Sequence, residues 1–349
     1  VLTLIYAMYK KCIERNCKRM KQSYYLYKSG RLQRKDNTLE IVYKDNTKKS
    51  IPIERVDDIY VMTELDFNTN LLNFVSQFGV NVHFFNYYGF YTGTYYPKES
   101  LVSGKLLIKQ VEHYNDKEKR LNIAKAFIDA ASYNIYRNLT YYNNRGKDLK
   151  DYMQEIDYLR KQIKSCKDVP ELMGIEGNIR KVYYDSWNII INQDIAFEKR
   201  VKNPPDNAIN SLISYVNTII YTRVLSEIYK TQLNPTISYL HEPSERRFSL
   251  CLDIAEIFKP IIADRLIFSM LNKRQITEKD FEEGLNFTYI KDSARKNITR
   301  EIDLRLQTKI KHKKLDREVS YEYLMRLEVY KLIKHLLEDE EYEGFKMWW

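Results

Sequence analysis

The chain of 349 residues contains little cysteine, glycine or proline: four, ten and eight residues respectively. The four cysteines are Cys12, Cys17, Cys166 and Cys251. They form no C-x-x-C pair, so the sequence supports neither a structural zinc site nor a disulfide framework. Unpaired, scattered cysteines are typical of a reducing, cytoplasmic setting. Because glycine and proline interrupt helices, their scarcity favours long helices.

The sequence also lacks a glycine-rich phosphate loop, internal repeats and low-complexity segments. The apolar stretch near the start, VLTLIYAMY, is too short to span a membrane. Its charged residues come after the apolar stretch, whereas a secretory signal carries them before it. We therefore expect a cytoplasmic protein without a membrane segment.

Positive charge is in excess. Lysine and arginine number 57 against 47 acidic residues, which gives a net charge of +10 and an isoelectric point near 9.1. Such an excess favours a polyanionic partner, nucleic acid first, although charge alone fits a purely solubilising role equally well. The 30 tyrosines offer rings that can stack on unpaired bases, but most of them are expected to pack in the core or at interfaces.

The first part of the chain has a hydrophobic period near two, which is typical of β-strands. The segments that we expect to be strands are 24–28, 38–44, 49–53, 58–62, 81–86 and 89–96, with one helix over 68–78. His83 lies inside an aromatic strand and is interpreted as a packing residue, not a ligand. We predict a small N-terminal β-sandwich-like domain over residues 20–96, followed by a linker over 97–103.

From residue 104 to residue 349 the hydrophobic period is near 3.6, which is typical of helices. The segments that we expect to be helical are 106–114, 118–142, 147–166, 181–193, 208–229, 252–265, 277–283, 292–310 and 320–337. Gly284 is a plausible end for the helix over 277–283. The fold class is therefore predicted as α+β, with the β domain followed by a larger all-α catalytic domain.

Three polar residues stand out against this helical background: His241, Asp253 and Glu256. The two acids are three residues apart in a segment of helical periodicity, so they share one helix face. They fit either a solvated helix edge or a site. Asp253 lies between Leu252 and Ile254 in a strongly apolar run, which favours a partly buried acid with a partner.

A further acid, Glu176, lies between Gly174 and Gly177 at the start of another predicted helix. On its own it fits an ordinary acid at a helix start, where the helix dipole favours negative charge. Glycines beside it permit close approach of a backbone or a phosphate. One imidazole and two or three carboxylates on neighbouring helices would suit a hard divalent cation such as Mg²⁺ or Mn²⁺.

Four blocks in order, GIEG, NPPDNAINSLIS, ISYLHE and LCLDIAEIFKPIIADR, resemble the signature blocks of CRISPR-associated protein one, the spacer-acquisition integrase. The resemblance runs from about residue 20 to the C-terminus, so residues 1–19 are expected to be an N-terminal extension outside the β domain. The sequence reads QLNP and ISYLH where the family often has a glycine. The positions that correspond to ligands are intact.

The resemblance implies a catalytic site made of Glu176, His241, Asp253 and Glu256. Glu176, His241 and Glu256 correspond to the family's metal ligands, for Mg²⁺ or Mn²⁺. Asp253 corresponds to an acid that is needed for activity and lies near the metal or its water. Lys259 takes the place of a basic residue that could meet a phosphate at the metal.

Basic residues close in sequence to these blocks are candidates for contacts with the DNA backbone, which position a duplex without reading its bases. They are Arg180, Lys181, Lys199, Arg200, Lys202, Arg246, Arg247 and Lys259. Arg246 and Arg247 fit a solvated turn equally well.

The resemblance further implies that a homodimer joins the dimer of CRISPR-associated protein two and inserts short duplex DNA into a repeat array by transesterification from 3′-OH ends. Hydrolysis by the same site would make the protein an endonuclease. Two alternatives remain at this point. One is a homologous transposon-type integrase, and the other is a non-catalytic nucleic-acid-binding scaffold.

Overall fold

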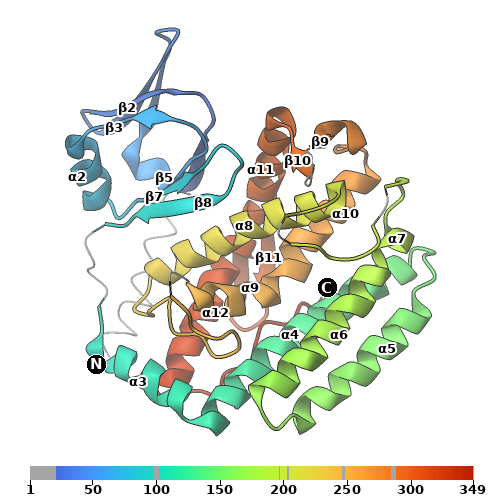
Figure 1. Cartoon of the computed structure of the whole chain (residues 1–349). Helices are drawn as coiled ribbons and strands as arrows, with labels where there is room; N and C mark the ends of the chain where they lie inside the picture. Colours follow the sequence, from blue (N-terminus) through green and yellow to red (C-terminus); the bar gives the residue numbers. More distant parts are fainter. Residues whose placement is uncertain are drawn as a thin grey trace. The chain divides into compact units, whose positions relative to one another are not determined.

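The computed structural model describes residues 21–97, 102–195, 197–202, 204–245, 248–283 and 288–348. At Glu283 it describes the backbone only. The chain divides into two compact units, with the boundary between residues 100 and 101 (Figure 1). The first unit is rich in strands and the second is mainly helical. The predicted N-terminal extension over residues 1–19 lies outside the described residues. Among those described, no helix is both long and apolar enough to cross a membrane.

The described part of the first unit, residues 21–97, holds eight strands, one α-helix and one short 3₁₀ turn. They are β1 (Gln22–Leu26), β2 (Gly30–Lys35), β3 (Thr38–Tyr43), β4 (Lys48–Pro52), a 3₁₀ turn (Ile53–Arg55), β5 (Val56–Val61), β6 (Leu65–Asp66), α2 (Thr69–Gln77), β7 (Asn81–Phe85) and β8 (Tyr91–Tyr95).

These strands form two four-stranded sheets, ordered β1-β5-β7-β8 and β4-β3-β2-β6. In the first sheet β1, β5 and β7 are parallel and β8 is antiparallel to β7. In the second, β2, β3 and β4 form an antiparallel meander, and β6 runs parallel to β2. Side chains of both sheets and of α2 share one apolar core, which includes Ile41, Ile59 and Phe74. The prediction of a β-sandwich-like domain with one helix is confirmed.

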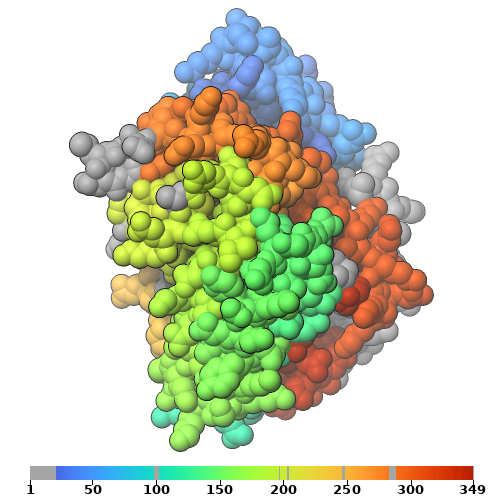
Figure 2. Space-filling view, turned by 90° about the vertical axis from the view of Figure 1, so that its right-hand side faces the viewer, coloured from blue at the N-terminus to red at the C-terminus, as the bar shows by residue number. Residues whose placement is uncertain are grey.

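The second unit begins with four long helices, of which the last three lie side by side (Figure 1). They are α3 (Gly104–Asn115), α4 (Lys117–Asn143), α5 (Lys150–Gln162) and α6 (Val169–Asp185). A 3₁₀ turn (Ile163–Ser165) follows α5, and the single turn α7 (Trp187–Ile190) follows α6. Figure 2 shows the green to yellow-green segment around α5 and α6 covering a large part of one face of this unit.

The remaining elements of the second unit are helices with two short strand pairs. They are α8 (Ala208–Tyr229), α9 (Ser249–Phe258), a π-helical turn (Lys259–Asp264), α10 (Arg265–Asn272), a 3₁₀ turn (Glu278–Asp280), β9 (Phe281–Glu283), β10 (Thr288–Ile290), α11 (Asp292–Gln307), β11 (Lys309–His312), β12 (Arg317–Ser320) and α12 (Tyr321–Leu336).

The centre of the helical unit is the pair α8 and α9, which pack on each other, while α9 also packs on α4. Buried residues occur on every face of α8, and nine of the ten residues of α9 are buried. A helix that is apolar all round belongs in the middle of a core. Polar groups on α9, Asp253 and Glu256 among them, are therefore held inside the protein and need partners there.

The structure differs from the prediction of an all-α second domain, because this unit also contains short strands. Residues 281–283 and 288–290 form an antiparallel pair instead of part of a helix over 277–283, and residues 309–312 pair with 317–320. Gly284, the predicted end of that helix, lies outside the described residues. The larger unit is thus predominantly helical, with two hairpin-like pairs.

A second departure concerns α6, which begins at Val169, before the helical run that was predicted to start near Glu176 and before the periodic segment over 181–193. The side chain of Asp168 caps it by accepting the backbone N–H of Glu171 at 2.8 Å, and Pro170 lies in its first turn. Gly174 and Gly177 are therefore inside the helix. A glycine inside a helix is less favourable than alanine by about 1 kcal/mol, which is why the sequence pattern placed the helix start later.

Candidate metal centre

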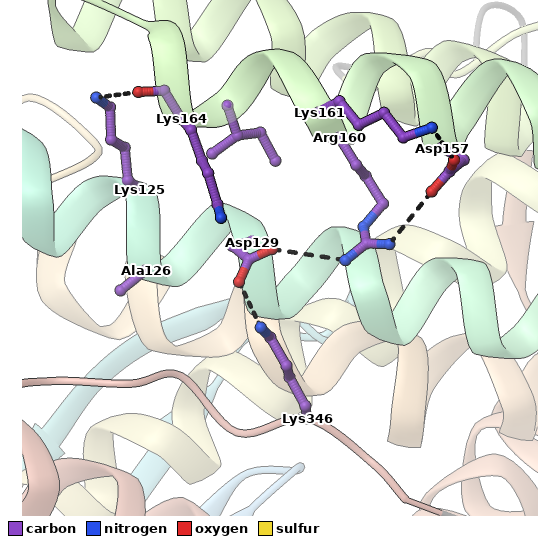
Figure 3. A pocket seen from close by; sticks show the side chains of 9 residues that line it. Lys125, Ala126, Asp129, Asp157, Arg160, Lys161, Lys164 and Lys346 are labelled. Carbon is purple, nitrogen blue, oxygen red and sulfur yellow. Dashed lines mark hydrogen bonds and ion pairs between the residues drawn. The ribbon is translucent and has the colours of Figure 1, made fainter.

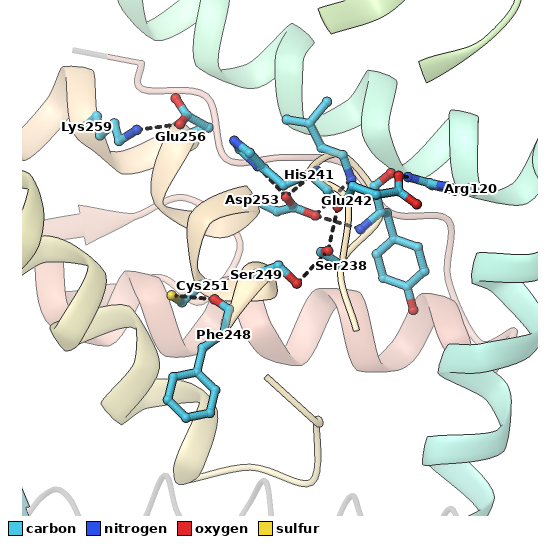
Figure 4. A network of polar contacts seen from close by, with 12 residues as sticks. Arg120, Ser238, His241, Glu242, Phe248, Ser249, Cys251, Asp253, Glu256 and Lys259 are labelled. Carbon is cyan, nitrogen blue, oxygen red and sulfur yellow. Dashed lines mark hydrogen bonds and ion pairs between the residues drawn. The ribbon is translucent and has the colours of Figure 1, made fainter. Parts of the chain in front are cut away.

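The loop that carries His241 is fixed to α9 by the carboxylate of Asp253 (Figure 4). Oδ2 of this fully buried acid accepts the backbone N–H of Tyr239 at 2.7 Å and that of Leu240 at 3.0 Å. Oδ1 accepts the backbone N–H of His241 at 3.0 Å and lies 2.8 Å from the imidazole Nδ1. Asp253 thus receives three backbone donors and one side-chain donor, so both of its oxygens are engaged within the protein.

These contacts also decide how the imidazole is presented. Nδ1 of His241 faces a carboxylate that accepts hydrogen bonds, so Nδ1 carries the proton and Nε2 keeps its lone pair. Metal-ligating histidines commonly donate their other ring N–H to a carboxylate in this way. The prediction placed Asp253 beside the metal or its water; in the structure its oxygens face the His241 loop.

The same loop is held on its other side by α3 and α4. Glu242 accepts a hydrogen bond from the hydroxyl of Tyr114 at 2.6 Å and one from Nη2 of Arg120 at 2.6 Å. Nε of Arg120 donates to the carbonyl of Tyr239 at 3.0 Å. Sequence reasoning missed Arg120, because its partners are more than a hundred residues away along the chain.

The two remaining predicted ligands are connected by one arginine. Arg180 lies one turn after Glu176 on α6, and its Nε donates to Oε1 of Glu176 at 3.1 Å. Its Nη2 forms an ion pair with Oε2 of Glu256 on α9. The other oxygen of Glu256 pairs with the ammonium of Lys259. Glu176, Glu256, Arg180 and Lys259 therefore form one cluster between α6 and α9.

The Glu256 carboxyl is ionised in this cluster. Burial by itself would raise its pKa, but the charges of Lys259 and Arg180 outweigh burial and lower the pKa to about 2. A protonated His241 would act in the same direction, so the imidazole lies within electrostatic reach of Glu256. Arg180 thus links Glu176 to Glu256, and His241, with Asp253 behind it, lies near Glu256, but the ligand atoms of Glu176, His241 and Glu256 do not all lie within 4.8 Å of one another.

The donor set suits a divalent cation. Glu176 and Glu256 supply carboxylate oxygens, and His241 supplies a neutral nitrogen. Arg180 bridges the carboxylates as a cation does, and its Nη1 is buried without a hydrogen-bond partner among the described residues. An unpaired guanidinium N–H needs a hydrogen-bond acceptor such as a phosphate oxygen, so this atom points to an anion beside the carboxylates and not to the metal ion itself.

Asp264 belongs to the same region, and the sequence analysis did not single it out. It ends the π-helical turn that follows α9, is 2 % exposed, and leaves Oδ2 without a partner among the described residues. Burial raises its pKa to about 7, although the positive charge of Arg180 opposes that rise. A π-turn inserted next to Glu256 is a feature that often marks a functional site.

The candidate DNA contacts divide into three groups. Lys259 is buried and Arg180 is mostly buried, and both are paired with the carboxylates. Arg200 donates to Ser214 Oγ at 2.8 Å and to the side-chain oxygen of Asn210 at 3.1 Å, so it fixes its own segment to α8. Lys181, Lys199 and Lys202 are exposed, and Arg246 and Arg247 lie outside the described residues.

The fold and this site define a β-sandwich-like domain joined to a helical domain with a buried carboxylate and histidine centre. Comparison with known proteins agrees: the family model described as CRISPR associated protein Cas1 matches residues 24–303. The chain belongs to this family. It is 62% identical over 330 residues to the CRISPR-associated endonuclease Cas1 of Fusobacterium nucleatum, covering 95% of this chain and 98% of that protein.

Solved structures show the same fold. The Cas1 protein TM1797 of Thermotoga maritima has a TM-score of 0.81 at 40% identity, covering 93% of this chain and all of that one. A casposase bound to an integration product also has a TM-score of 0.81, at 21% identity, with 93% of this chain and 92% of that chain covered. The latter likeness shows the fold alone.

Proposed function

We propose that the protein is a metal-dependent DNA integrase and endonuclease that inserts short foreign DNA segments into a CRISPR array. The observation that carries the proposal is the cluster itself: Arg180 links Glu176 to Glu256, while Asp253 presents the imidazole of His241 to the same region. Relatives that match 94–95% of this chain are named CRISPR-associated endonucleases, which supports this function.

Glu176, Glu256 and Nε2 of His241 are the groups that would hold the cation, Mg²⁺ or Mn²⁺. When bound, such an ion polarises the scissile phosphate and stabilises charge on the attacking or leaving oxygen. Asp253 keeps His241 in the required tautomer and position. His241 therefore acts as a ligand and not as the nucleophile.

Basic groups beside the carboxylates suit the phosphates of DNA. The ammonium of Lys259 and the guanidinium of Arg180 lie directly against Glu256. Electrostatic stabilisation by such fixed charges contributes strongly to catalysis where charge develops on phosphate oxygens. Gly174 and Gly177 flank Glu176 on α6, and a Cβ atom added at either position would meet nothing within 4 Å. The two glycines are three residues apart and share a helix face, so this open space lets a DNA backbone approach that face of α6 closely.

The proposed substrates are duplex DNA with 3′-OH ends and the repeat and leader DNA of the array. The proposed assembly is a homodimer that joins a dimer of CRISPR-associated protein two, in the cytoplasm. In the β unit, Tyr87, Tyr88 and Phe90 are 73, 57 and 49 % exposed between β7 and β8. An apolar surface of this kind suits a contact around a two-fold axis.

Neither alternative has comparable support. A transposon-type integrase shares the fold, but the casposase likeness is at 21% identity, against 62% for the named CRISPR endonuclease. A non-catalytic scaffold has no need to keep four ionisable groups together in one largely buried cluster, because removing charges from water is costly.

The test is strand transfer on a branched DNA that contains a 3′-OH end, with and without Mn²⁺. His241→Ala is expected to abolish joining while the affinity for duplex DNA stays nearly unchanged. Many phosphate contacts supply that affinity, and one metal ligand adds little to it. His312→Ala, a histidine of β11, serves as the matched control and should retain wild-type joining. Full activity of His241→Ala, or joining by the wild type in EDTA, would rule out the proposed function.

A further inference from the structure

A basic pocket lies away from the carboxylate cluster, between α4, the C-terminal end of α5 and the chain's C-terminal tail (Figure 3). Its volume is about 520 Å³. We call it the α4–α5 pocket and define it by its lining residues Lys125, Ala126, Asp129, Asp157, Arg160, Lys161, Ile163, Lys164 and Lys346. It shares no residue with the metal centre.

Cations outnumber acids in this pocket. Five cationic side chains and two carboxylates line it, so its net charge is +3. Asp129 is held between Lys346 at 2.5 Å and Arg160 at 3.5 Å, and Asp157 pairs with Lys161 at 2.8 Å. The ammonium of Lys164 has no carboxylate partner among the described residues, and Figure 3 shows it directed into the pocket.

The cations are held in place by groups from distant parts of the chain. Lys346 lies between Phe345, whose carbonyl accepts from Nδ2 of buried Asn134 at 2.9 Å, and Met347, whose N–H donates to Oδ1 of Asn134 at 2.9 Å. Arg160 donates to Oγ of Ser132 at 3.2 Å. The cationic side chains of the pocket repel one another because its net charge is positive. An anionic ligand would reduce this repulsion.

We propose that the α4–α5 pocket binds backbone phosphates of DNA outside the metal centre. The inference rests on the proposed function, because an enzyme that joins DNA must hold a duplex along more of its length than one metal centre covers. The pocket is open: Lys161 and Lys346 are 75 and 44 % exposed, so a continuous polymer can pass over it.

An acidic peptide fits this lining less well than DNA does. Its backbone N–H groups would need acceptors, and the only side-chain acceptors in the lining are Asp129 and Asp157, both engaged with cations. A nucleic-acid backbone presents phosphate acceptors alone, which match ammonium and guanidinium donors. The pocket would therefore contribute affinity without sequence preference.

The first experiment compares the salt dependence of duplex binding by fluorescence anisotropy, in EDTA. The double variant Lys164→Gln/Lys346→Gln removes two cations, and Lys150→Gln removes one exposed cation at the other end of α5 as the matched control. If the two cations each neutralise a phosphate, the slope of log K against log salt falls by about 1.8, from roughly 0.9 per contact. The control should keep the wild-type slope.

The same comparison is repeated on a His241→Ala background, where the chemistry is absent. A reduced slope there supports the pocket even if strand transfer fails its own test, so the two proposals can fail separately. Amine-reactive labelling of the wild type, read by mass spectrometry, checks the site without substitutions: duplex should protect Lys164 and leave Lys150 reactive. An unchanged slope together with unprotected Lys164 overturns the proposal, and protection by polyglutamate alone would assign the pocket to an acidic protein.

Discussion

The imidazole Nδ1 of His241 lies 2.8 Å from Oδ1 of Asp253, and the same oxygen accepts the backbone N–H of His241 at 3.0 Å. One carboxylate therefore fixes both the ring and the backbone of the proposed ligand. Asp253 is fully buried, so the geometry is shielded from competition by water. The acid acts through His241, which makes it a positioning residue.

Asp253→Asn is expected to destabilise the protein. Whichever way the new amide is turned, its NH₂ group faces hydrogen-bond donors: the N–H groups of Tyr239 and Leu240, or the N–H and Nδ1–H of His241. Each buried donor left unpaired costs about 1–3 kcal/mol. Thermal unfolding in EDTA measures the change, and Mn²⁺ affinity should fall as well.

The matched control for that substitution is Glu242→Gln. Glu242 neighbours His241, but its side chain is 71 % exposed, and exposed pairs contribute about 1 kcal/mol or less. A wild-type melting temperature for Asp253→Asn would contradict the assigned positioning role.

Arg180→Gln should lower the stability of the metal-free protein and raise its affinity for Mn²⁺. Arg180 is the cation shared by Glu176 and Glu256, so without it the two carboxylates repel each other and metal-free stability falls. A divalent cation then no longer competes with the guanidinium, and Mn²⁺ affinity should rise. Calorimetric titration measures the affinity, with exposed Lys181→Gln on the same helix as control. Weaker Mn²⁺ binding by Arg180→Gln would show that Arg180 supports the cation instead of competing with it.

Gly174→Ala/Gly177→Ala separates stability from activity. Both glycines are inside α6 with open space around them, so alanine should stabilise the helix by about 1 kcal/mol at each position. Strand transfer should nevertheless fall, because the added methyl groups occupy the face of α6 over which we propose that the DNA backbone passes. Thermal unfolding and the joining assay read the two effects.

Gly344→Ala is the contrasting control. Its Cβ would lie 2.5 Å from Cβ of Ala130, so this substitution should lower stability. If Gly174→Ala/Gly177→Ala joined DNA at the wild-type rate, the open face of α6 would not be a substrate surface.

Asp264 predicts a dependence of stability on pH. Its folded pKa of about 7 lies above its ordinary value of 3.8. Between these two pH values the folded state keeps a proton that the unfolded state has lost, so stability falls as pH rises through this window. The loss is at most about 4 kcal/mol, at 1.4 kcal/mol per unit.

Asp264→Asn removes this titration. Its melting temperature in EDTA, relative to wild type, should therefore rise from pH 4 to pH 8. Asp151→Asn, at an exposed carboxyl of α5, should show no such trend. A difference between Asp264→Asn and wild type that is independent of pH would contradict the burial argument.

The sequence predicted the elements with strong hydrophobic periodicity, and it did less well where polarity or glycine hides the pattern. The alternating apolar residues of β3, β5 and β7 were found, whereas β2, with the sequence GRLQRK, was missed because only Leu32 points into the core. The start of α6 was missed because two glycines argue against a helix interior. β11 is likewise mostly polar.

The candidate site was predictable as a set of residues but not as a network. Spacing places Asp253 and Glu256 on one helix face, yet it does not reveal that Asp253 turns to the His241 loop and Glu256 to Arg180. Those partners come from contacts between α6, α9 and a loop, which no local pattern encodes. Asp264 was overlooked for the same reason, since its importance comes from burial near these charges.

The most direct test of the account is the number of Mn²⁺ ions bound per chain, measured by electron paramagnetic resonance of the free ion. The wild type should bind one ion tightly at this site, and Glu176→Gln, His241→Ala and Glu256→Gln should each lose it while retaining the folded structure by circular dichroism. If all three folded variants bound Mn²⁺ with wild-type affinity and number, these residues would not form a metal centre, and the proposed chemistry would be contradicted.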